Sequence, residues 1–388
     1  MTKIKEGYKE TEIGVIPVEW EVVKVGTILN VQTGKMNAQD QVDGGKYPFF
    51  TRSVDVQSID TYAYDTEALF IAGEGNFKVK YYKGKFNLHQ RTYMLTSIDD
   101  NNMKFLLNSI QPKVTKLIST SVGSTVQSLR KPIIEALKIP LPPLKEQEKI
   151  ADILCSADDK IDAIASQIEK AETLKKGLLQ KLLSEGIGHS EFKDSELGKI
   201  PLGWEVVEIR DIGKVSMCKR IMKNETTDCG KIPFYKIGTF GKEANAYISE
   251  EVYEEYKNKY SFPKQGDILI SASGTIGRLV VYNGEPAYFQ DSNIVWIANQ
   301  EDKVLNSFLF YTYKTVKWHT DGNTIARLYN ENLRRIRIPL PPLEEQKQIA
   351  EILSTSDEKL EVLRDKKQKY ETLKKGLLQK LLSGEIRV

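Results

Sequence analysis

The chain has 388 residues, of which 40% are hydrophobic and 28% are charged. At roughly 150 residues per domain this length favours two or three domains, and the composition is typical of a folded protein and argues against wholesale disorder. The 56 basic and 53 acidic side chains give a net charge of +3, a balance that does not by itself indicate a nucleic-acid partner.

Cysteine usage and hydropathy favour a reducing cytosol. The three cysteines, Cys155, Cys218 and Cys229, form no CxxC pair, which argues against a disulfide framework and against a zinc ribbon. The opening residues, MTKIKEGYKE, contain no apolar signal core, and no run of about 18 apolar residues occurs in the sequence. We therefore expect a cytoplasmic protein without a membrane partner.

A tandem duplication organises the sequence. The segment EIGVIPVEWEVV at residues 12–23 recurs as ELGKIPLGWEVV at residues 196–207, an offset of 184. Further along, IPLPPLKEQEKIADIL at 139–154 recurs as IPLPPLEEQKQIAEIL at 338–353, an offset of 199, and ETLKKGLLQKLLS occurs twice without change. The offsets differ by 15, so the second copy carries about fifteen extra residues. Solenoid repeats are only about 20 to 50 residues long; here a whole domain and its connector are duplicated.

Each copy divides into a strand-rich part and a helical part. Residues 1–140 and 189–339 are rich in Val, Ile, Tyr, Phe, Thr and Gly, with short apolar runs between turn residues, a pattern typical of strands and tight turns. A short helix is expected at 307–317. Residues 141–188 and 340–388 contain a Pro-Pro pair near their start and no later proline, which predicts one long helix in each. We expect an α+β fold: two globular, β-rich domains of mixed α/β structure, separated by two long helices.

Apolar residues recur along both expected helices at alternating spacings of four and three. A sustained repeat of 3.5 residues is typical of a coiled coil. The predicted seam consists of Ile150, Leu154, Ile161, Ile164, Ile168, Leu178 and Leu182 in the first helix and Ile349, Leu353, Leu360, Leu363, Leu377 and Leu381 in the second. Lys175 and Lys374 are polar exceptions in this seam, and Asp158 is interpreted as part of a solvated face. The alternative is two separate surface helices, but about 40 residues is long for such a helix.

Connectivity limits how the two helices can pair. The first helix leaves the first domain and the second helix leaves the second domain, so helices that pair over their length must be antiparallel. At 1.5 Å per residue, about 40 residues span roughly 60 Å. We therefore expect an antiparallel coiled-coil spacer with a globular domain at each end, and an approximate two-fold axis that relates the duplicated halves.

No motif of a catalytic site is evident. The three histidines, His89, His189 and His319, lack metal-binding spacing, and no GxxxxGK[ST] phosphate loop occurs. The glycines of AGEGNF and SASGTIG follow expected strands but lack the GxGxxG spacing of a dinucleotide-binding loop. The sequence therefore predicts binding surfaces and no catalytic centre.

Together these features resemble the specificity (S) subunit of type I restriction–modification enzymes. The resemblance covers essentially the whole chain. Its motifs recur in the same order in both halves: the IP…WE opening, a GTIG-like turn after a strand, the GSTV/GNTI segment, and the IPLPPL-x-EQ-x-x-IA entry to a long helix that ends in LLQKLL. The entry motif, which begins at Ile139 and at Ile338, is the most specific of these signals.

The resemblance implies a DNA-binding role without catalysis by this chain. In such subunits each globular part, here 1–140 and 189–339, is a target recognition domain that reads one half of a split, asymmetric site in double-stranded DNA. The helical regions, 141–188 and 340–388, set the half-site spacing and dock modification (methyltransferase) subunits, of which we expect two per chain. S-adenosylmethionine, ATP and Mg²⁺ are expected on the modification and restriction subunits, and no cofactor or metal is expected on this chain.

Candidate DNA-binding residues follow from local clusters of basic and amide side chains. Arginine and lysine recognise guanine, asparagine and glutamine recognise adenine, and all four also bind phosphates. The candidates in the first half are Lys35, Arg52, Asn76, Lys78, Lys80, His89, Gln90, Arg91, Ser124 and Thr125. The candidates in the second half are Lys219, Arg220, Lys223, Ser273, Thr275, Arg278, Asn293, Asn323 and Arg327.

Several of these candidates have an equally good structural interpretation. Thr275 and Gly277 fit a hairpin turn as well as a DNA contact. Gln90 and Gln290 follow corresponding strands, where a buried amide that satisfies backbone groups is as consistent with the sequence as base readout is. The GSTV/GNTI segments fit a helix cap or a turn.

The two halves should read different half-sites, so identical residues are better candidates for the scaffold. We expect the reading residues where the halves differ, in 35–46 against 219–231 and in 52–64 against 238–256. The competing function is a tandem adaptor that binds protein partners through the coiled coil and reads no DNA. A sequence-selective binding assay separates the two functions.

Overall fold

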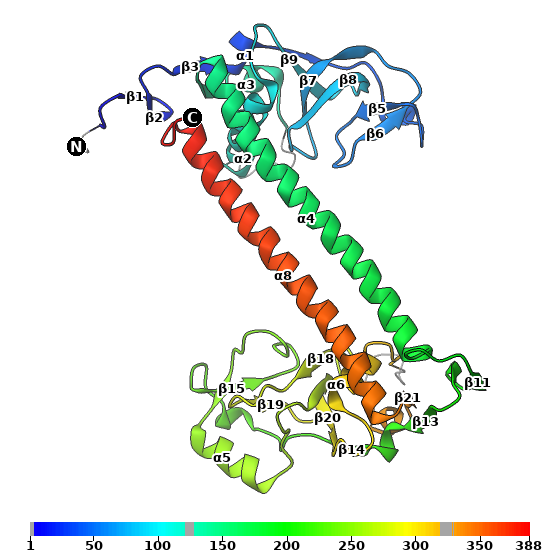
Figure 1. Ribbon diagram of the computed structural model, residues 1–388. Coiled ribbons are helices and arrows are strands. Elements are labelled where there is room, and N and C mark those ends of the chain that lie inside the picture. The colour runs from blue at the N-terminus through cyan, green and yellow to red at the C-terminus, as the bar shows by residue number, and fades with distance from the viewer. Residues whose placement is uncertain (1–3, 121–127, 319–327, 329) are drawn as a thin grey trace. The chain divides into compact units, whose positions relative to one another are not determined.

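The computed structural model describes residues 4–120, 128–318, 328 and 330–388, and its ribbon is drawn in Figure 1. Among these described residues, no helix is long and apolar enough to cross a lipid bilayer.

By its internal contacts the chain divides into two units. Unit 1 comprises Met1–Ser166 and Asp365–Val388, and unit 2 comprises Gln167–Arg364. The divisions fall inside the two long helices, α4 (Leu144–Ser184, 41 residues) and α8 (Leu343–Leu382, 40 residues). Each unit therefore contains one strand-rich part and a portion of both long helices.

The strand-rich part of unit 1 is built on a six-stranded sheet. The strands of this whole part, of which β4 to β9 form the sheet, are β1 (Tyr8–Thr11), β2 (Gly14–Pro17), β3 (Glu21–Lys24), β4 (Leu29–Thr33), β5 (Tyr47–Phe50), β6 (Gln57–Ile59), β7 (Tyr64–Ala72), β8 (Lys80–Leu88), β9 (Thr92–Ser97) and β10 (Lys138–Leu141). Its short helices are α1 (Val25–Ile28), the 3₁₀ turn η1 (Ala38–Asp40), α2 (Met103–Thr120) and α3 (Lys131–Glu135). The sheet has the order β4-β9-β7-β8-β5-β6, and only the β5–β8 pair is parallel.

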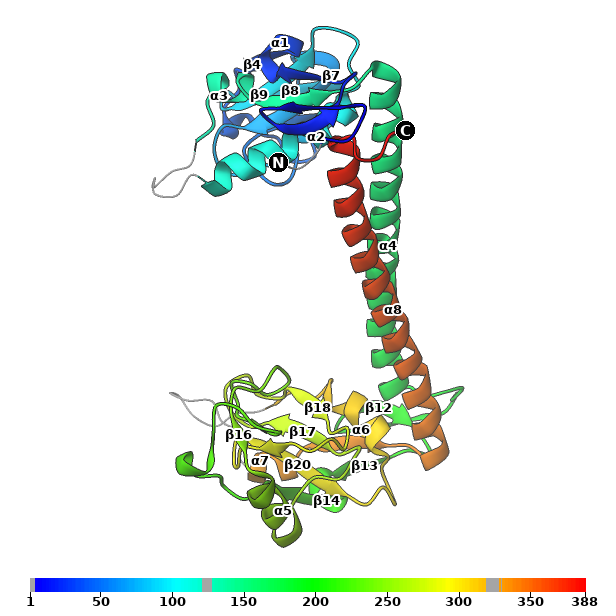
Figure 2. The ribbon, with the colours of Figure 1, turned by 90° about the vertical axis from the view of Figure 1, so that its left-hand side faces the viewer.

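The main core of unit 1 contains residues of this sheet, of helix α2, of the start of α4 and of the end of α8. Strand β7 is buried from Ala68 to Ala72 because both of its faces are covered: Leu69 and Ile71 belong to one core cluster, and Ala68 and Phe70 belong to a second. Helix α2 lies against β7 and β8 (Figure 2). Its buried residues Leu106, Ile110 and Val114 are spaced four apart and so share one helical face. Burial of each such side chain contributes about 1.5–3 kcal/mol.

Unit 2 repeats this topology with shorter strands. Its strands are β11 (Phe192–Ser195), β12 (Gly198–Pro201), β13 (Glu205–Glu208), β14 (Gly213–Ser216), β15 (Ile232–Tyr235), β16 (Tyr247–Ile248), β17 (Ile268–Ser271), β18 (Leu279–Val281), β19 (Tyr288–Phe289), β20 (Ile294–Asn299) and β21 (Arg337–Leu340). Its shorter helices are η2 (Ile209–Asp211), η3 (Lys223–Glu225), α5 (Glu250–Lys259), α6 (Asn306–Tyr313) and α7 (Asn330–Arg334). The order β14-β20-β17-β18 matches β4-β9-β7-β8, and the parallel pair β15–β19 matches β5–β8.

The helices of unit 2 differ in two places from the sequence prediction. The helix expected at 307–317 is α6, which ends at Tyr313. The backbone N–H groups of Lys314 and Thr315 donate to the carbonyls three residues back, at Tyr311 and Thr312, and so form a tighter turn. Helix α5 was not predicted; it lies between β16 and β17, where the second copy is longer than the first. Its N-cap is Ser249, whose hydroxyl accepts the N–H of Val252.

The two motifs that recur in the sequence are neighbours in each unit. In unit 1, β3 pairs with β10 so that Val23 lies opposite Ile139. In unit 2, β13 pairs with β21 so that Val207 lies opposite Ile338. These antiparallel ladders bring the start and the end of each strand-rich part together, next to the first turn of a long helix.

The glutamate of the EQ motif binds the tryptophan of the opening motif. Trp20 Nε1 donates to Glu146 Oε2 at 2.9 Å, and Trp204 Nε1 donates to Glu345 Oε2 at 2.9 Å. Both tryptophans are fully buried, and a buried indole N–H needs an acceptor. The glutamates therefore orient the starts of α4 and α8 on the strand-rich parts.

The glutamine of the EQ motif satisfies backbone groups. The Gln147 side chain donates to the Pro142 carbonyl at 2.9 Å and accepts the N–H of Asn102, just before α2, at 3.0 Å. Gln346 makes the same two kinds of bond in unit 2. Since both amides are buried, these bonds satisfy groups that would otherwise be costly to desolvate.

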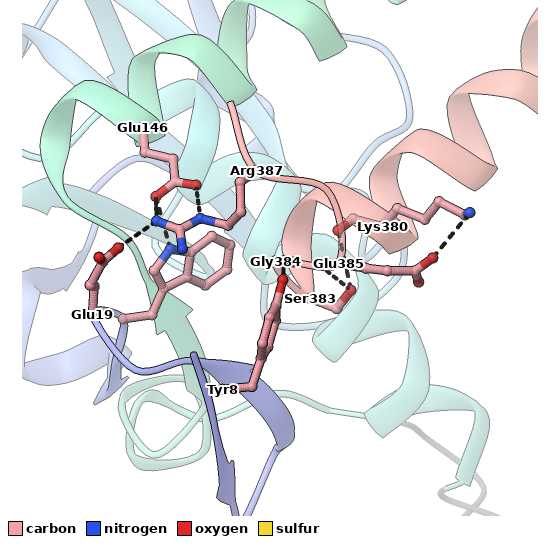
Figure 3. Close-up of polar contacts among 9 residues, drawn as sticks. Tyr8, Glu19, Glu146, Lys380, Ser383, Gly384, Glu385 and Arg387 are labelled. Carbon is pink, nitrogen blue, oxygen red and sulfur yellow. Dashed lines mark hydrogen bonds and ion pairs between the residues drawn. The ribbon is translucent and has the colours of Figure 1, made fainter. Parts of the chain in front are cut away.

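Residues that follow α8 close on the start of α4 within unit 1 (Figure 3). Arg387 donates from Nε to Glu146 Oε1 at 2.7 Å and from Nη2 to Glu19 Oε2 at 2.6 Å. The Tyr8 hydroxyl donates to the Gly384 carbonyl at 2.8 Å. The Glu146 side chain is only 7% exposed. Its bonds, with those of Glu19, raise the pKa of Arg387 above the usual value.

Unit 2 contains an equivalent arrangement. Glu345 Oε1 accepts the N–H of Ile187 at 2.9 Å and lies 2.8 Å from His189 Nε2. In both units the segment that follows one long helix therefore binds the glutamate at the start of the other.

The long helices pack side by side and antiparallel within each unit. In unit 1 the pair Asp158–Lys374 joins them, and in unit 2 the pair Lys175–Asp357 joins them. The buried seam residues are Ile150, Leu154, Ile164, Leu182, Ile349, Leu353, Leu360 and Leu381. The half-buried seam residues are Ile161, Ile168, Leu178, Leu363 and Leu377. The predicted α+β fold with two long antiparallel helices is confirmed.

Candidate nucleic-acid interface

Four loops of unit 1 meet at one place, which we call loop cluster 1. They are residues 34–41 after β4, 51–56 after β5, 73–79 after β7 and 89–91 after β8. Backbone hydrogen bonds join them: Gln90 donates to the Met36 carbonyl at 2.9 Å, His89 to Phe50 at 3.0 Å, Gly73 to Arg91 at 2.9 Å and Asn76 to Arg52 at 3.3 Å. A cavity of about 210 Å³ lies between the loops and includes Arg52 and His89 in its lining.

Two arginines of loop cluster 1 share one carboxylate. Arg52 Nη1 lies 3.1 Å from Glu74 Oε2, and Arg91 Nη1 lies 3.0 Å from the same oxygen. All three side chains are accessible to solvent. Because exposed ion pairs contribute only about 0–1 kcal/mol, either arginine can leave Glu74 for a DNA phosphate or base.

The other lysines and amides predicted in the first half lie on the same loops, except Lys80, which is the first residue of β8. Lys80 Nζ donates to the Ser53 carbonyl at 2.7 Å. Asn76 Oδ1 accepts the Lys78 N–H at 2.8 Å. Gln90 Nε2 donates to Asn37 Oδ1 at 2.6 Å. Lys35 is exposed on the first of the four loops.

His89 is enclosed by loop cluster 1. The residue is 4% exposed, and its Nδ1 accepts the backbone N–H of Arg91 at 3.0 Å. Burial lowers the pKa of His89, and the charges of Arg52 and Arg91 lower it further. This geometry favours a neutral imidazole that supports the loop, and a DNA contact by His89 stays a prediction.

Unit 2 contains a corresponding loop cluster 2. Its loops are residues 217–226 after β14, 236–246 after β15, 272–278 after β17 and 290–293 after β19. Gln290 donates its backbone N–H to the Tyr235 carbonyl at 2.9 Å, and this bond corresponds to the one from His89 to Phe50 in unit 1. Ala272 donates its backbone N–H to the Asn293 carbonyl at 2.7 Å, and this bond corresponds to the one from Gly73 to Arg91. The two loop clusters are thus held by equivalent backbone bonds.

Loop cluster 2 surrounds a cavity of about 360 Å³. Arg220, Lys223 and Asn293 are among its lining residues. Arg220 Nε donates to Asp291 Oδ2 at 2.9 Å. Lys219, next to Arg220, is exposed, and its ammonium lies 5.2 Å from the centre of the Tyr260 ring.

Other predicted residues of the second half take part in the structure of a turn. Ser271 Oγ accepts the N–H of Arg278 at 2.8 Å and donates to the Thr275 carbonyl, and Arg278 Nη1 donates to the Phe240 carbonyl at 2.7 Å. Gly277 has a φ of +78°, and a Cβ there would lie 2.2 Å from Trp318 Nε1. This position therefore requires glycine, and the turn interpretation has direct support.

Two more predicted residues lie between the loops. Ser273 Oγ donates to Asn293 Oδ1 at 2.8 Å, which joins the loop after β17 to the loop after β19. The Gln290 amide oxygen accepts the N–H of Ile237 at 2.9 Å. Of the two interpretations that the sequence allowed for Gln290, this bond supports the one in which the amide satisfies a backbone group. Ser124, Thr125, Asn323 and Arg327 lie outside the described residues.

The acidic partners of the basic residues were not predicted from the sequence. Glu74 and Asp291 were not candidates, although each binds a predicted arginine. Asn37 was included only within the range 35–46. Its partner Gln90 is 53 positions away, and no local pattern shows that these residues meet. Among the described residues, no group of three or more His, Cys, Asp or Glu side chains is arranged to hold a metal ion.

Comparison with known proteins gives consistent matches over the chain. The family model of the type I restriction modification DNA specificity domain matches twice, at residues 17–173 and 201–372. A provisionally named type I restriction enzyme specificity subunit of Haemophilus influenzae is 39% identical, over 87% of this chain and 86% of its own. The type I restriction enzyme MjaVIII specificity subunit of Methanocaldococcus jannaschii is 30% identical, over 99% of this chain and 97% of its own.

Solved structures share the fold. The crystal structure of a type I restriction–modification system S subunit from M. genitalium superposes with a TM-score of 0.66 and 17% identity, over 98% of each chain. A chain from a structure of a type I restriction–modification system superposes with a TM-score of 0.55 and 16% identity, over 96% of this chain and 99% of that one.

Proposed function

Because the chain belongs to the family of type I restriction–modification DNA specificity subunits, we propose that loop cluster 1 and loop cluster 2 each read one half of a bipartite, asymmetric DNA site. Members of this family confer specificity and are not themselves catalytic, which agrees with the absence of a catalytic motif in the sequence.

One observation carries the proposal. Equivalent backbone bonds hold the two loop clusters, yet the side chains they present differ: paired arginines around Glu74 in unit 1, and Arg220 with Asp291 in unit 2. A duplicated scaffold with different exposed side chains is what a protein needs to read two different half-sites. Base edges supply the sequence information, while lysines and arginines around them hold phosphates.

The long helices supply the second part of the proposal. We assign α4 and α8 as a spacer that sets the distance between the half-sites and as the docking surface for modification subunits, two per chain. Helices of 41 and 40 residues correspond to roughly 60 Å at 1.5 Å per residue. The functional segments in this proposal are 1–140, 141–188, 189–339 and 340–388.

The chemistry of the complex belongs to its other subunits. Methylation with S-adenosylmethionine is assigned to the modification subunits, and ATP- and Mg²⁺-dependent translocation and cleavage to restriction subunits. We propose that this chain acts in the cytoplasm, where its target DNA lies.

A binding assay tests the proposal. The chain, purified with the methyltransferase subunit that co-purifies with it, is titrated with a panel of duplexes at several salt concentrations. We expect selective binding that weakens as salt increases, because phosphate contacts release counterions. Equal affinity for all duplexes would contradict DNA readout and would favour a tandem adaptor that binds only proteins through its helices.

A further inference from the structure

One side-chain contact joins the same two loops in both loop clusters, but different residues make it. In unit 1, Gln90, after β8, donates to Asn37, after β4, at 2.6 Å. In unit 2, Arg220, after β14, donates through Nε to Asp291, after β19, at 2.9 Å. Gln90 and Asp291 each lie two residues beyond the end of the strand that pairs in parallel with β5 or β15. They therefore occupy equivalent positions.

We propose that these cross-loop pairs determine base specificity: Gln90, paired with Asn37, selects an adenine in one half-site, and Arg220, oriented by Asp291, selects a guanine in the other. An amide recognises N6 and N7 of adenine with one acceptor and one donor, whereas a guanidinium recognises O6 and N7 of guanine with two donors. The inference rests on the proposed function, since it assigns base preferences to a surface whose contact with DNA is itself proposed.

The geometry of the Arg220–Asp291 pair suits base recognition. The Arg220 side chain is 66% exposed, whereas Asp291 is 16% exposed. Of the three guanidinium nitrogens of Arg220, only Nε donates to Asp291, and among the described residues the two terminal nitrogens have no hydrogen-bond partner. These two nitrogens form the edge of the guanidinium that recognises guanine. Because the Arg220 side of this ion pair is open to solvent, the pair is weak enough for Asp291 to orient Arg220 without preventing its contact with DNA.

The backbone around Asp291 is constrained. Gln290, the preceding residue, donates its N–H to Tyr235 and accepts the N–H of Ile237 with its side chain. Ser292, the following residue, has a φ of 59°. This left-handed conformation is uncommon outside glycine and is retained where the surrounding structure imposes it. A side chain held in place before binding discriminates better between bases, because it loses less freedom on binding.

The amide pair in unit 1 is held in a similar way. Gln90 donates its backbone N–H to the Met36 carbonyl at 2.9 Å, and Asn37 donates its backbone N–H to Asp40 Oδ2 at 2.6 Å. Both side chains are exposed. The bond to Asn37 uses one amide hydrogen of Gln90, which leaves its carbonyl oxygen and second hydrogen for N6 and N7 of adenine.

The test measures base preference position by position. The chain in complex with its methyltransferase subunit is titrated with duplexes in which each base pair of the recognised sequence is replaced in turn. In Arg220→Gln, we expect the preference for guanine at one position of one half-site to fall by roughly ten-fold to a hundred-fold, the range for one bidentate contact. In Gln90→Ala, the loss should occur at one adenine of the other half-site.

A matched control is available in unit 2. Arg210 Nε lies 2.8 Å from Glu208 Oε2 in an ion pair, and the two side chains are 59% and 16% exposed, close to the values for Arg220 and Asp291. Arg210 lies on η2, outside loop cluster 2. Arg210→Gln removes the same charge and a similar ion pair, and should leave every base preference unchanged. Arg220→Lys keeps the charge but not the planar fork, and should bind DNA with reduced discrimination at the same position.

Each alternative result overturns a defined part of the account. If Arg220→Gln weakens binding to all duplexes equally, the arginine binds a phosphate and the inference is wrong. Unchanged preferences in both Arg220→Gln and Gln90→Ala, with a selective wild-type complex, also contradict the inference but leave the proposed function intact. A wild-type complex that binds all duplexes equally contradicts the proposed function itself.

Discussion

Lys175 and Asp357 form an ion pair between α4 and α8 within unit 2, and Lys374 and Asp158 form the equivalent pair within unit 1. The two pairs are related by the 199-residue offset of the duplication. The lysines occupy positions that interrupt the apolar seam, so each interruption is balanced by an aspartate on the opposite helix. A polar pair at a seam position favours one register of a coiled coil over others.

The two ion pairs should differ in their contribution to stability. Asp357 also accepts the Tyr311 hydroxyl at 3.0 Å and lies 3.5 Å from Lys314 Nζ. Removal of Asp357 therefore leaves three partners without their acceptor, whereas removal of Asp158 affects mainly Lys374. We expect Asp357→Ala to lower the free energy of unfolding by about 1–2 kcal/mol and Asp158→Ala by less than about 1 kcal/mol. Urea unfolding of both variants measures this, and equal losses would contradict it.

The Asp357 contacts also predict a dependence on pH. Burial acts to raise the pKa of Asp357, but the bonds and charges of Lys175, Lys314 and Tyr311 outweigh burial and lower it below the usual value of 3.8. A carboxylate with a lowered pKa stabilises the folded state above its unfolded pKa and loses this effect as the pH falls through the folded pKa. The difference in unfolding free energy between the wild type and Asp357→Asn should be largest at neutral pH and shrink below about pH 4. A constant difference from pH 7 to pH 3 would refute this assignment.

Arg387 should stabilise the start of α4. It donates two hydrogen bonds to Glu146, whose side chain is mostly buried and which also accepts the indole N–H of Trp20. We expect Arg387→Ala to lower stability by about 2–3 kcal/mol, because it leaves a buried carboxylate with one partner fewer. Hydrogen exchange in the first turns of α4 reports the local loss.

The control for Arg387 is Lys380. Lys380 pairs with Glu385 at 3.1 Å, and both side chains are at least half exposed. Lys380→Ala removes the same charge nearby and should change stability by less than about 0.5 kcal/mol. If the amide hydrogens of α4 exchanged with solvent at the same rate in Arg387→Ala and Lys380→Ala, Arg387 would not support Glu146.

Several features of the fold could be predicted from sequence because their signals are local or repeated. The 3.5-residue spacing and the Pro-Pro pairs predicted α4 and α8, and the duplication predicted two equivalent strand-rich parts. The partners of Lys175 and Lys374 could not be predicted, since Asp158 on a helix is also compatible with a solvated face. Helix α5 was missed because the first copy offers no counterpart to compare with it.

The candidate site was predictable in its residue types but not in its contacts. Arg52, Gln90, Arg91 and Arg220 were identified as basic or amide side chains near expected turns. Their arrangement depends on how the folded sheets bring together loops that are far apart in the sequence: those after β4, β5, β7 and β8 in unit 1, and those after β14 and β19 in unit 2. Glu74 was not predicted for the same reason: its partners Arg52 and Arg91 lie on other loops, and only the folded sheet brings the three side chains together.

Glu74 should restrain non-specific DNA binding. It pairs with both Arg52 and Arg91 in the unbound protein and offsets one of their two positive charges. In Glu74→Gln both arginines are released, so affinity for unrelated duplexes should rise several-fold, and the dependence of log affinity on log salt should steepen by about 0.9 for each new phosphate contact.

Glu67→Gln provides the matched comparison for Glu74. Glu67 lies on β7, accepts the Tyr81 hydroxyl at 2.7 Å and pairs with Lys83 at 3.4 Å. The substitution changes net charge by the same amount without releasing an arginine of loop cluster 1. An equal gain in affinity for both variants would show that net charge alone is responsible.

The spacer proposal predicts the effect of added helix length. Seven residues inserted after Ser166 in α4 and seven after Asp365 in α8 preserve the heptad pattern and would lengthen the helical pair by roughly 10 Å. This corresponds to about three base pairs at 3.4 Å each. We expect an unspecified gap about three base pairs longer, with both half-sites unchanged, as determined by selection from a random duplex pool. A changed half-site with an unchanged gap would contradict the spacer role.

The most direct test of two-part DNA readout is the sequence context of the adenines that the complex methylates in a genome. The account predicts a motif with two different half-sites and a fixed gap between them. Substitutions in loop cluster 1 should change one half-site, and substitutions in loop cluster 2 should change only the other. A single contiguous motif, or substitutions in one loop cluster that alter both half-sites, would contradict the account.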